Sequence, residues 1–312
     1  MIENIPTDGL YDESYRKIID EMMQLREKQL HHDFEINKLG TNSLTYSIAD
    51  SIFLPFHKNK KLKRYSKHFL ARLSHYLKKN KKILVSNVVD AVWTRDVVES
   101  STFPYPVRRV EYPWAILNAK LNKPMKILDV GSGVSLFPVY LASKSHDVIS
   151  IDPDKILMER LSPKLAKFSG VKVNYQLGDV TNLNFEDGVF DRVFCISVIE
   201  HLEEEIVDGN YFNYHKQNLD VKAIGELLRV LKPGGLLIVT FDWNENPDEH
   251  RSYKLNDIYE RVLKSYRSNL VSDKKPELDW MELKEKHLEA EKSFPPYNYI
   301  TEGWAIGVIL KK

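Results

Sequence analysis

The stretch that decides the fold is a short apolar run that ends in an acid and a glycine turn, Lys126-Ile127-Leu128-Asp129-Val130-Gly131-Ser132-Gly133-Val134-Ser135. A run of β-prone residues that stops at Gly-x-Gly is typical of a buried parallel strand entering a tight loop. Gly131 and Gly133 lack a Cβ, so the backbone can adopt a positive φ and a ligand can lie directly against it. The stretch therefore predicts a strand at 127–130 that leads into a nucleotide-binding loop.

Beyond this strand the sequence alternates between strand and helix patterns. Further strands are predicted at 148–151, 171–177, 189–196 and 236–241, helices at 135–142 and 221–231, and a turn at 232–235; helices at 253–266 and 276–291 and a last strand at 304–310 follow. Strands that alternate with helices at this spacing favour an α/β fold, with a parallel sheet covered on both faces.

The part of the chain before residue 111 has a mainly helical pattern in place of alternating strands and helices. Apolar residues at helical spacing predict a helix at 14–39, and the apolar segment 83–98 is interpreted as a second helix. Between them, 58–82 holds 11 Lys or Arg and no acid, and its aromatic and leucine residues repeat at helical spacing, which predicts a basic amphipathic helix. A proline-rich aromatic segment at 103–114 is expected to join this region to the sheet. We therefore predict a helical N-terminal extension at 1–110 and an α/β domain at 111–312.

Composition limits the class of protein. The 45 basic and 44 acidic side chains nearly cancel, so no overall charge points to nucleic acid as a partner. The single cysteine, Cys195, rules out an internal disulfide and a cysteine-based zinc cluster, and we expect no metal and a buried Cys195. Because no apolar stretch reaches 18 residues and no cleavable signal is found, a soluble, cytoplasmic protein is expected.

Polar residues follow each of the first four strands. Asp129, Asp152, Asp179 and Ser197 stand where strands end, and parallel strands bring their carboxyl ends to one ligand-binding edge. Acids after the second and third strands suit ribose hydroxyls and an adenine amino group, and they disfavour a phosphate-bearing ligand. The pattern predicts a nucleoside with an amino-acid tail.

At these residues the sequence resembles the class I S-adenosylmethionine-dependent methyltransferases, and in particular their type 11 branch. The similarity covers about 111–242 and rests on five motifs in order: 127–133, 149–152, 178–180, 190–202 and 228–235. The resemblance implies a Rossmann-like, mostly parallel sheet whose last strand is antiparallel, with helices on both faces. It implies S-adenosylmethionine as cofactor, with contacts from Glu111, Asp129, Gly131, Ser132, Gly133, Asp152, Pro153, Asp179, Val180, Ile196 and Ser197; Trp114 is a further candidate beside Glu111.

Two alternatives remain open. A dinucleotide-binding dehydrogenase would carry a third glycine at position 136, where this chain has Leu136. A catalytically inactive fold that serves as a binding or scaffold subunit is the other alternative, although such a subunit would be free to lose the motifs that this chain keeps.

The resemblance also places a histidine near the methyl acceptor. His201 lies four residues beyond Ser197 and is the candidate general base, whereas packing around the cofactor pocket is its structural alternative. Glu200 is expected to face solvent or a neighbouring helix, or else to hold the tautomer of His201. The fourth strand lacks the Asn/Asp-Pro-Pro-Tyr/Phe turn of adenine N6 and glutamine methyltransferases, so we predict O-methylation of a small molecule or glycan, with N-methylation of a sugar amine or small amine as the alternative.

Specificity is expected from segments outside the common core. An insertion at 203–218 and a C-terminal helical lid at 243–300 provide candidate acceptor-binding residues, namely Tyr211, Tyr214, His215, Trp243, His250 and Arg251, each of which could instead pack internally. The basic segment 58–82 could contact an anionic membrane or a phosphate-bearing substrate, or it could be a solvated helix face.

Overall fold

The computed structural model describes residues 2–4, 13–38, 108–207, 210–213, 217–243, 253–254, 256–271 and 304–312. The predicted helices at 58–82, 83–98 and 276–291 lie outside these residues, as do Tyr214, His215, His250 and Arg251.

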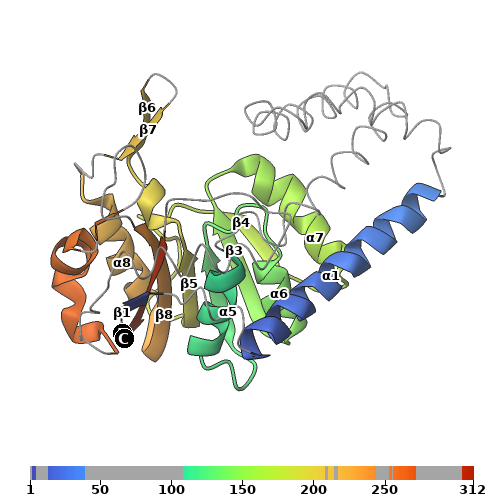
Figure 1. Ribbon diagram of the computed structural model, residues 1–312, viewed down its shortest axis with the longest axis horizontal. Helices are drawn as coiled ribbons and strands as arrows, with labels where there is room; N and C mark the ends of the chain where they lie inside the picture. The colour runs from blue at the N-terminus through green and yellow to red at the C-terminus, as the bar shows by residue number, and fades with distance from the viewer. Residues whose placement is uncertain are drawn as a thin grey trace.

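A seven-stranded sheet forms the centre of the molecule, with strand order β1-β9-β8-β5-β2-β3-β4 (Figure 1). Its strands are β1 (Ile2–Asn4), β2 (Lys126–Val130), β3 (Asp147–Asp152), β4 (Asn174–Leu177), β5 (Phe190–Ile196), β8 (Leu231–Trp243) and β9 (Trp304–Lys311). Strands β4, β3, β2, β5 and β8 are parallel, and β9 is antiparallel to β8. The predicted mostly parallel sheet with an antiparallel last strand is therefore confirmed.

The N-terminal region is more closely joined to this sheet than its sequence suggests. Strand β1 pairs with β9, so residues 2–4 extend the sheet instead of belonging to a purely helical extension. Helix α1 (Glu13–Lys38) confirms the predicted helix at 14–39. Helix α5 (Arg108–Asn118) replaces the expected irregular junction, and the boundary drawn at residue 110 falls inside it.

Helices cover both faces of the sheet. On one face lie α1, α5, α6 (Phe137–Ser143) and α7 (Ser162–Phe168), preceded by the π-helical turn η2 (Leu157–Leu161). On the other face lie α8 (Leu219–Arg229), the π-helical η4 (Asp257–Val262) and the 3₁₀ segment η5 (Lys264–Asn269). Among the helices that the structure describes, none combines the length and the apolar character that crossing a bilayer requires.

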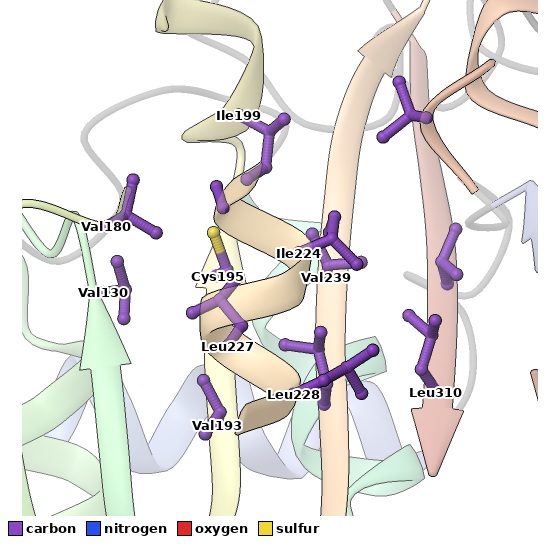
Figure 2. Packing of buried hydrophobic residues seen from close by; sticks show 14 of the residues in the cluster. Val130, Val180, Val193, Cys195, Ile199, Ile224, Leu227, Leu228, Val239 and Leu310 are labelled. Atoms are coloured by element: carbon purple, nitrogen blue, oxygen red, sulfur yellow. The ribbon is translucent and has the colours of Figure 1, made fainter. Parts of the chain in front are cut away.

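Alternation along the central strands explains why the two faces form separate cores. In β5, Phe194 and Ile196 belong to the core beneath α5 and α6, whereas Val193 and Cys195 belong to the core beneath α8. Figure 2 shows Ile224 and Leu227 of α8 packed against these strands, with the sulfur of Cys195 among them. Cys195 is a buried free thiol, as predicted.

Three predicted elements have different limits in the structure. Strand β4 begins at Asn174, because Val171 N first donates to Ala166 O in the turn that closes α7. The predicted turn at 232–235 is a bulge within β8, since Phe190 pairs with Leu231 but Arg192 pairs with Leu236. The predicted helix at 253–266 is instead formed by η4 and η5, which meet at Leu263, and the backbone of Tyr266 inside η5 is non-helical.

The insertion after β5 begins with the 3₁₀ turn η3 (Ile199–His201) and continues as a hairpin of β6 (Glu204–Val207) and β7 (Asn210–Asn213). The hairpin projects away from the sheet (Figure 1), so the segment that carries Tyr211 forms a separate two-stranded unit.

Candidate functional site

The two glycines of the loop after β2 have different roles. Gly131 has φ +68° and Gly133 has φ +52°, values that glycine adopts without strain. A Cβ on Gly131 would lie 2.4 Å from Cγ2 of Val198, so this glycine lets the loop close against the residue that follows Ser197. A Cβ on Gly133 would have no described atom within 4 Å, which leaves open space where a ligand can lie.

Asp152, at the end of β3, closes the loop from the other side. Gly133 N donates to Oδ2 of Asp152 over 3.0 Å, and Asp154 N donates to Oδ1 over 2.9 Å. Burial raises the pKa of Asp152, and these two backbone donors oppose the rise. Because each carboxylate oxygen can accept a second hydrogen bond, Asp152 can also receive two ribose hydroxyls. Pro153, the next residue, is exposed.

Asp179 follows β4 and is exposed. Its Oδ1 accepts hydrogen bonds from the backbone N and from Oγ1 of Thr181, each over 2.8 Å, whereas its Oδ2 receives no hydrogen bond from the described chain. A fixed carboxylate with one available oxygen suits an amino donor such as that of adenine. Val180 is buried beside it.

Asp129 lies beneath the loop, with only 3% of its surface exposed. Oγ of Ser150 is 3.4 Å from Oδ2 of Asp129 and donates to Oγ of Ser132 over 2.7 Å. Burial raises the pKa of Asp129 to about 7, with Ser150 opposing the rise and Asp152 adding to it. Asp129 and Ser132 therefore shape the loop from within the protein.

Ser197 follows β5 directly with φ +46° and is the centre of a buried polar network. Oε1 of Glu111 accepts hydrogen bonds from Oγ of Ser197 and from Oγ1 of Thr240, each over 2.6 Å. Arg108 pairs with the other oxygen of Glu111, and its Nη1 donates to Oγ of Ser197 over 2.7 Å. Oδ1 of Asp242 lies 3.2 Å from the same hydroxyl. The network thus ties α5 to the carboxyl ends of β5 and β8.

This network changes the roles expected for two residues before the sheet. Glu111 is fully buried and both of its oxygens are engaged by protein groups, so it holds α5 in place and presents no surface to a ligand. Trp114 is 1% exposed and packs against Gly307, where a Cβ would lie 2.3 Å from its ring.

Two residues expected near the acceptor are also buried. The prediction that Glu200 faces solvent is wrong, because the side chain is fully buried and its Oε1 accepts a hydrogen bond from Asp242 N. Trp243, a candidate acceptor contact, is fully buried in the core beneath α8. Ile196 is 7% exposed and packs in the opposite core.

His201 is exposed at the end of η3, one turn beyond Ser197. Its charge is near enough to Asp242 to act on the pKa of that carboxyl. Burial and then Glu111 raise the pKa of Asp242, whereas Arg108 and His201 lower it. An exposed imidazole therefore lies near a largely desolvated carboxyl group.

Three members of the network were not expected from the sequence. Arg108, Thr240 and Asp242 are 89, 43 and 45 residues away from Ser197 in the chain. Only Asp242 carried a usable signal, since it follows a predicted strand as Asp129 and Asp152 do.

The comparisons with known proteins agree with this geometry. Residues 128–239 match a family described as a methyltransferase domain. A norajmaline N-methyltransferase of Rauvolfia serpentina is 29% identical over 157 residues, which are 48% of this chain and 47% of that protein. A ubiquinone biosynthesis O-methyltransferase of Rickettsia felis is 31% identical over 134 residues, 42% of this chain and 48% of that protein.

The solved structure of a S-adenosylmethionine-dependent methyltransferase from Aquifex aeolicus aligns with 70% of this chain and 97% of that chain, with 17% identity and a TM-score of 0.46. The chain spans about half the length of the curated relatives that it matches. The open space at Gly133 and the carboxylates of Asp152 and Asp179 fit S-adenosylmethionine. The chain carries a class I S-adenosylmethionine-dependent methyltransferase domain.

Proposed function

We propose that this chain methylates a hydroxyl group of a small molecule or glycan, with His201 as the base. The observation that carries the proposal is the exposed imidazole of His201, one turn beyond Ser197 and beside the carboxyl group of Asp242. Bound S-adenosylmethionine supplies an activated methyl group, so the protein has to orient the acceptor and remove its proton.

The surroundings of His201 suit proton removal. The imidazole is exposed and can therefore meet an acceptor hydroxyl directly. The imidazole takes the proton that leaves the acceptor hydroxyl, and the carboxyl group of Asp242 lies near enough to interact with that charge. The relatives named above include an O-methyltransferase and an N-methyltransferase, which supports methyl transfer without choosing the atom.

The test begins with methyl-labelled S-adenosylmethionine and fractionated cell extract, followed by identification of the labelled fraction. His201→Gln is then assayed on that acceptor. We expect turnover to fall about 10²- to 10⁴-fold, as for loss of a general base, with unchanged affinity for S-adenosylhomocysteine by calorimetry. Full turnover in His201→Gln would remove the base from the proposal.

N-methylation of a small amine is the second candidate, and the charge balance near Ser197 favours it. Glu111, Glu200 and Asp242 are carboxyl groups of this region, and Arg108 is the buried cation among them. An amine can bind beside this excess of acid as the ammonium ion, lose that proton to solvent, and then attack the methyl group as the neutral amine without a base from the protein. For an amine acceptor, Asp242→Asn should raise KM and His201→Gln should change turnover less than tenfold. Mass spectrometry of the labelled product separates the two candidates.

The basic segment 58–82 lies outside the described residues, and we propose it as a contact for an anionic membrane or a phosphate-bearing acceptor. Its 11 basic residues, with no acid among them, support that role. Reversing several of these charges should abolish sedimentation with phosphatidylserine vesicles. Unchanged binding after the reversal would leave the segment as a solvated surface.

A further inference from the structure

A concave site lies at the edge of the sheet opposite the glycine loop. We call this the amino edge, where β5 and β8 begin, and the edge of Asp129 and Ser197 the carboxyl edge. The cavity has a volume of about 460 Å³, within the range of small-molecule pockets. Its lining includes Asn118 at the end of α5 and Gly234 in the bulge of β8.

Apolar side chains line part of this cavity. Leu236 and Ile309 come from β8 and β9, on the face that α5 covers. Val271 lies next to them because its backbone N donates to Ile309 O, and half of its surface is exposed. An aliphatic group that covered Val271 would remove this apolar surface from water.

The remaining lining is cationic. Lys120, Arg192 and Lys311 line the cavity, and no acid is found among its described lining residues. Asp191 is adjacent in sequence, but its Oδ1 accepts from Nζ of Lys232 and its Oδ2 accepts from Lys126 N, each over 2.9 Å. The acid adjacent in sequence therefore already has its own partners.

Arg192 is held in position without a carboxylate. Its Nε donates to Ala119 O over 2.5 Å and its Nη1 donates to Asp191 O over 2.7 Å. Within the described chain, Nη2 of Arg192 donates to no protein acceptor, and no acidic side chain forms an ion pair with the guanidinium. Burial lowers the pKa of Arg192, with Asp191 opposing, which agrees with a partly desolvated cation. A guanidinium fixed by two carbonyls is pre-organised to bind a planar or tetrahedral anion.

We propose that this cavity binds a small amphipathic anion, with a carboxylate or phosphate head on Arg192, Lys120 and Lys311 and an aliphatic tail on Leu236, Val271 and Ile309. The site lies at the amino edge, so it is separate from the cofactor loop and does not depend on which acceptor the enzyme methylates.

Calorimetry on the full chain, with S-adenosylhomocysteine present at saturation, provides the test. Octanoate and octyl phosphate should bind with one site per chain, while octanol and octylammonium should not. The head that binds more tightly identifies the anion. Equal binding of octanol, or no binding of either anion, would overturn the proposal.

Variants locate the site. Arg192→Gln and Lys311→Gln should each weaken binding at least tenfold, and Lys264→Gln, an exposed lysine of η5 outside the cavity, should leave it unchanged. Lys120→Asn gives a sharper test, since Lys120 has φ +53°, which asparagine tolerates better than lysine. This variant should melt at a higher temperature than the wild type and yet bind the anion less tightly. Unchanged binding in all three cavity variants would overturn the assignment even if Arg192→Gln failed to fold.

Discussion

Charged residues lie at both ends of strands β5 and β8, and the two ends differ in how far those charges are removed from water. At the carboxyl edge, Arg108 and Glu111 are 9% and 0% exposed in their side chains. At the amino edge, Lys232 and Asp191 are 43% and 29% exposed. Removing one charge of the first pair leaves its partner desolvated, whereas removing one charge of the second leaves its partner hydrated. Equivalent substitutions should therefore lower the free energy of unfolding by very different amounts.

The largest effect is expected from Arg108→Met. This change leaves Glu111 buried without its cation, and loss of one partner of a buried pair costs about 3 to 5 kcal/mol. Urea unfolding at pH 7 measures the loss. A cost below about 1 kcal/mol would mean that the two edges do not differ as their burial suggests.

The pH dependence of stability tests the carboxyl edge in a second way. The folded-state pKa of Asp129 is raised to about 7 from 3.8, so between these values the folded protein holds a proton that the unfolded chain releases. This contribution therefore makes the free energy of unfolding fall as pH rises from about 4 to about 7, by about 2 to 4 kcal/mol.

In the Asp129→Asn variant, the free energy of unfolding should not show this part of its fall with rising pH. Urea unfolding of both proteins at pH 5, 6, 7 and 8 provides the comparison, since buried carboxyl groups that do not interact with Asp129 contribute equally to both. Parallel curves for variant and wild type would show that Asp129 is ionised in the folded protein throughout.

The two loop glycines should separate stability from ligand affinity. Gly131→Ala adds a Cβ against Val198 at a positive φ, so it should destabilise the fold by about 1 to 3 kcal/mol more than Gly133→Ala. Gly133→Ala has room for its methyl group in the protein but places it where the cofactor is expected, so S-adenosylhomocysteine should bind at least tenfold less tightly.

Val198→Ala supplies the control for this pair. Combined with Gly131→Ala, it removes the two closest atoms and should recover part of the lost stability, whereas it should not restore ligand binding to Gly133→Ala. The absence of any recovery would show that strain at φ +68°, and not contact with Val198, explains the glycine.

The smallest effect is expected from Lys232→Met at the amino edge. Its ion pair with Asp191 is partly exposed, so the free energy of unfolding should change by no more than about 1 kcal/mol. The same urea titration as for Arg108→Met gives the comparison, and raising the salt concentration should reduce the difference further. A loss as large as that of Arg108→Met would contradict the distinction between the edges.

Local patterns in the sequence predicted much of the fold. The glycine turn after residues 127–130, the alternation of strands and helices, and the polar residues that end four strands all depend on short stretches of chain. The position of Asp152 beside the loop, and that of Asp179 after β4, followed from the rule that parallel strands end at one edge. The same rule placed Ser197 there, but it gave no information on its partners.

Other features were beyond the reach of local patterns. The bulge at 232–235 depends on pairing with β5, and β1 became a strand because β9 offered it an edge. The burial of Glu200 depends on β8, which supplies the donor Asp242 N.

The sequence by itself thus determined the order of the elements and the residues at the carboxyl edge, because both follow from the periodicity of neighbouring residues. Tertiary structure alone decided which charges are desolvated. Arg108, Ser197 and Asp242 meet only when α5 packs across β5 and β8, and the cationic cavity at Arg192 forms only where α5 ends beside β8 and β9. The energy of a charge depends on its distance from water and from other charges, and those distances are fixed by contacts between segments far apart in the chain.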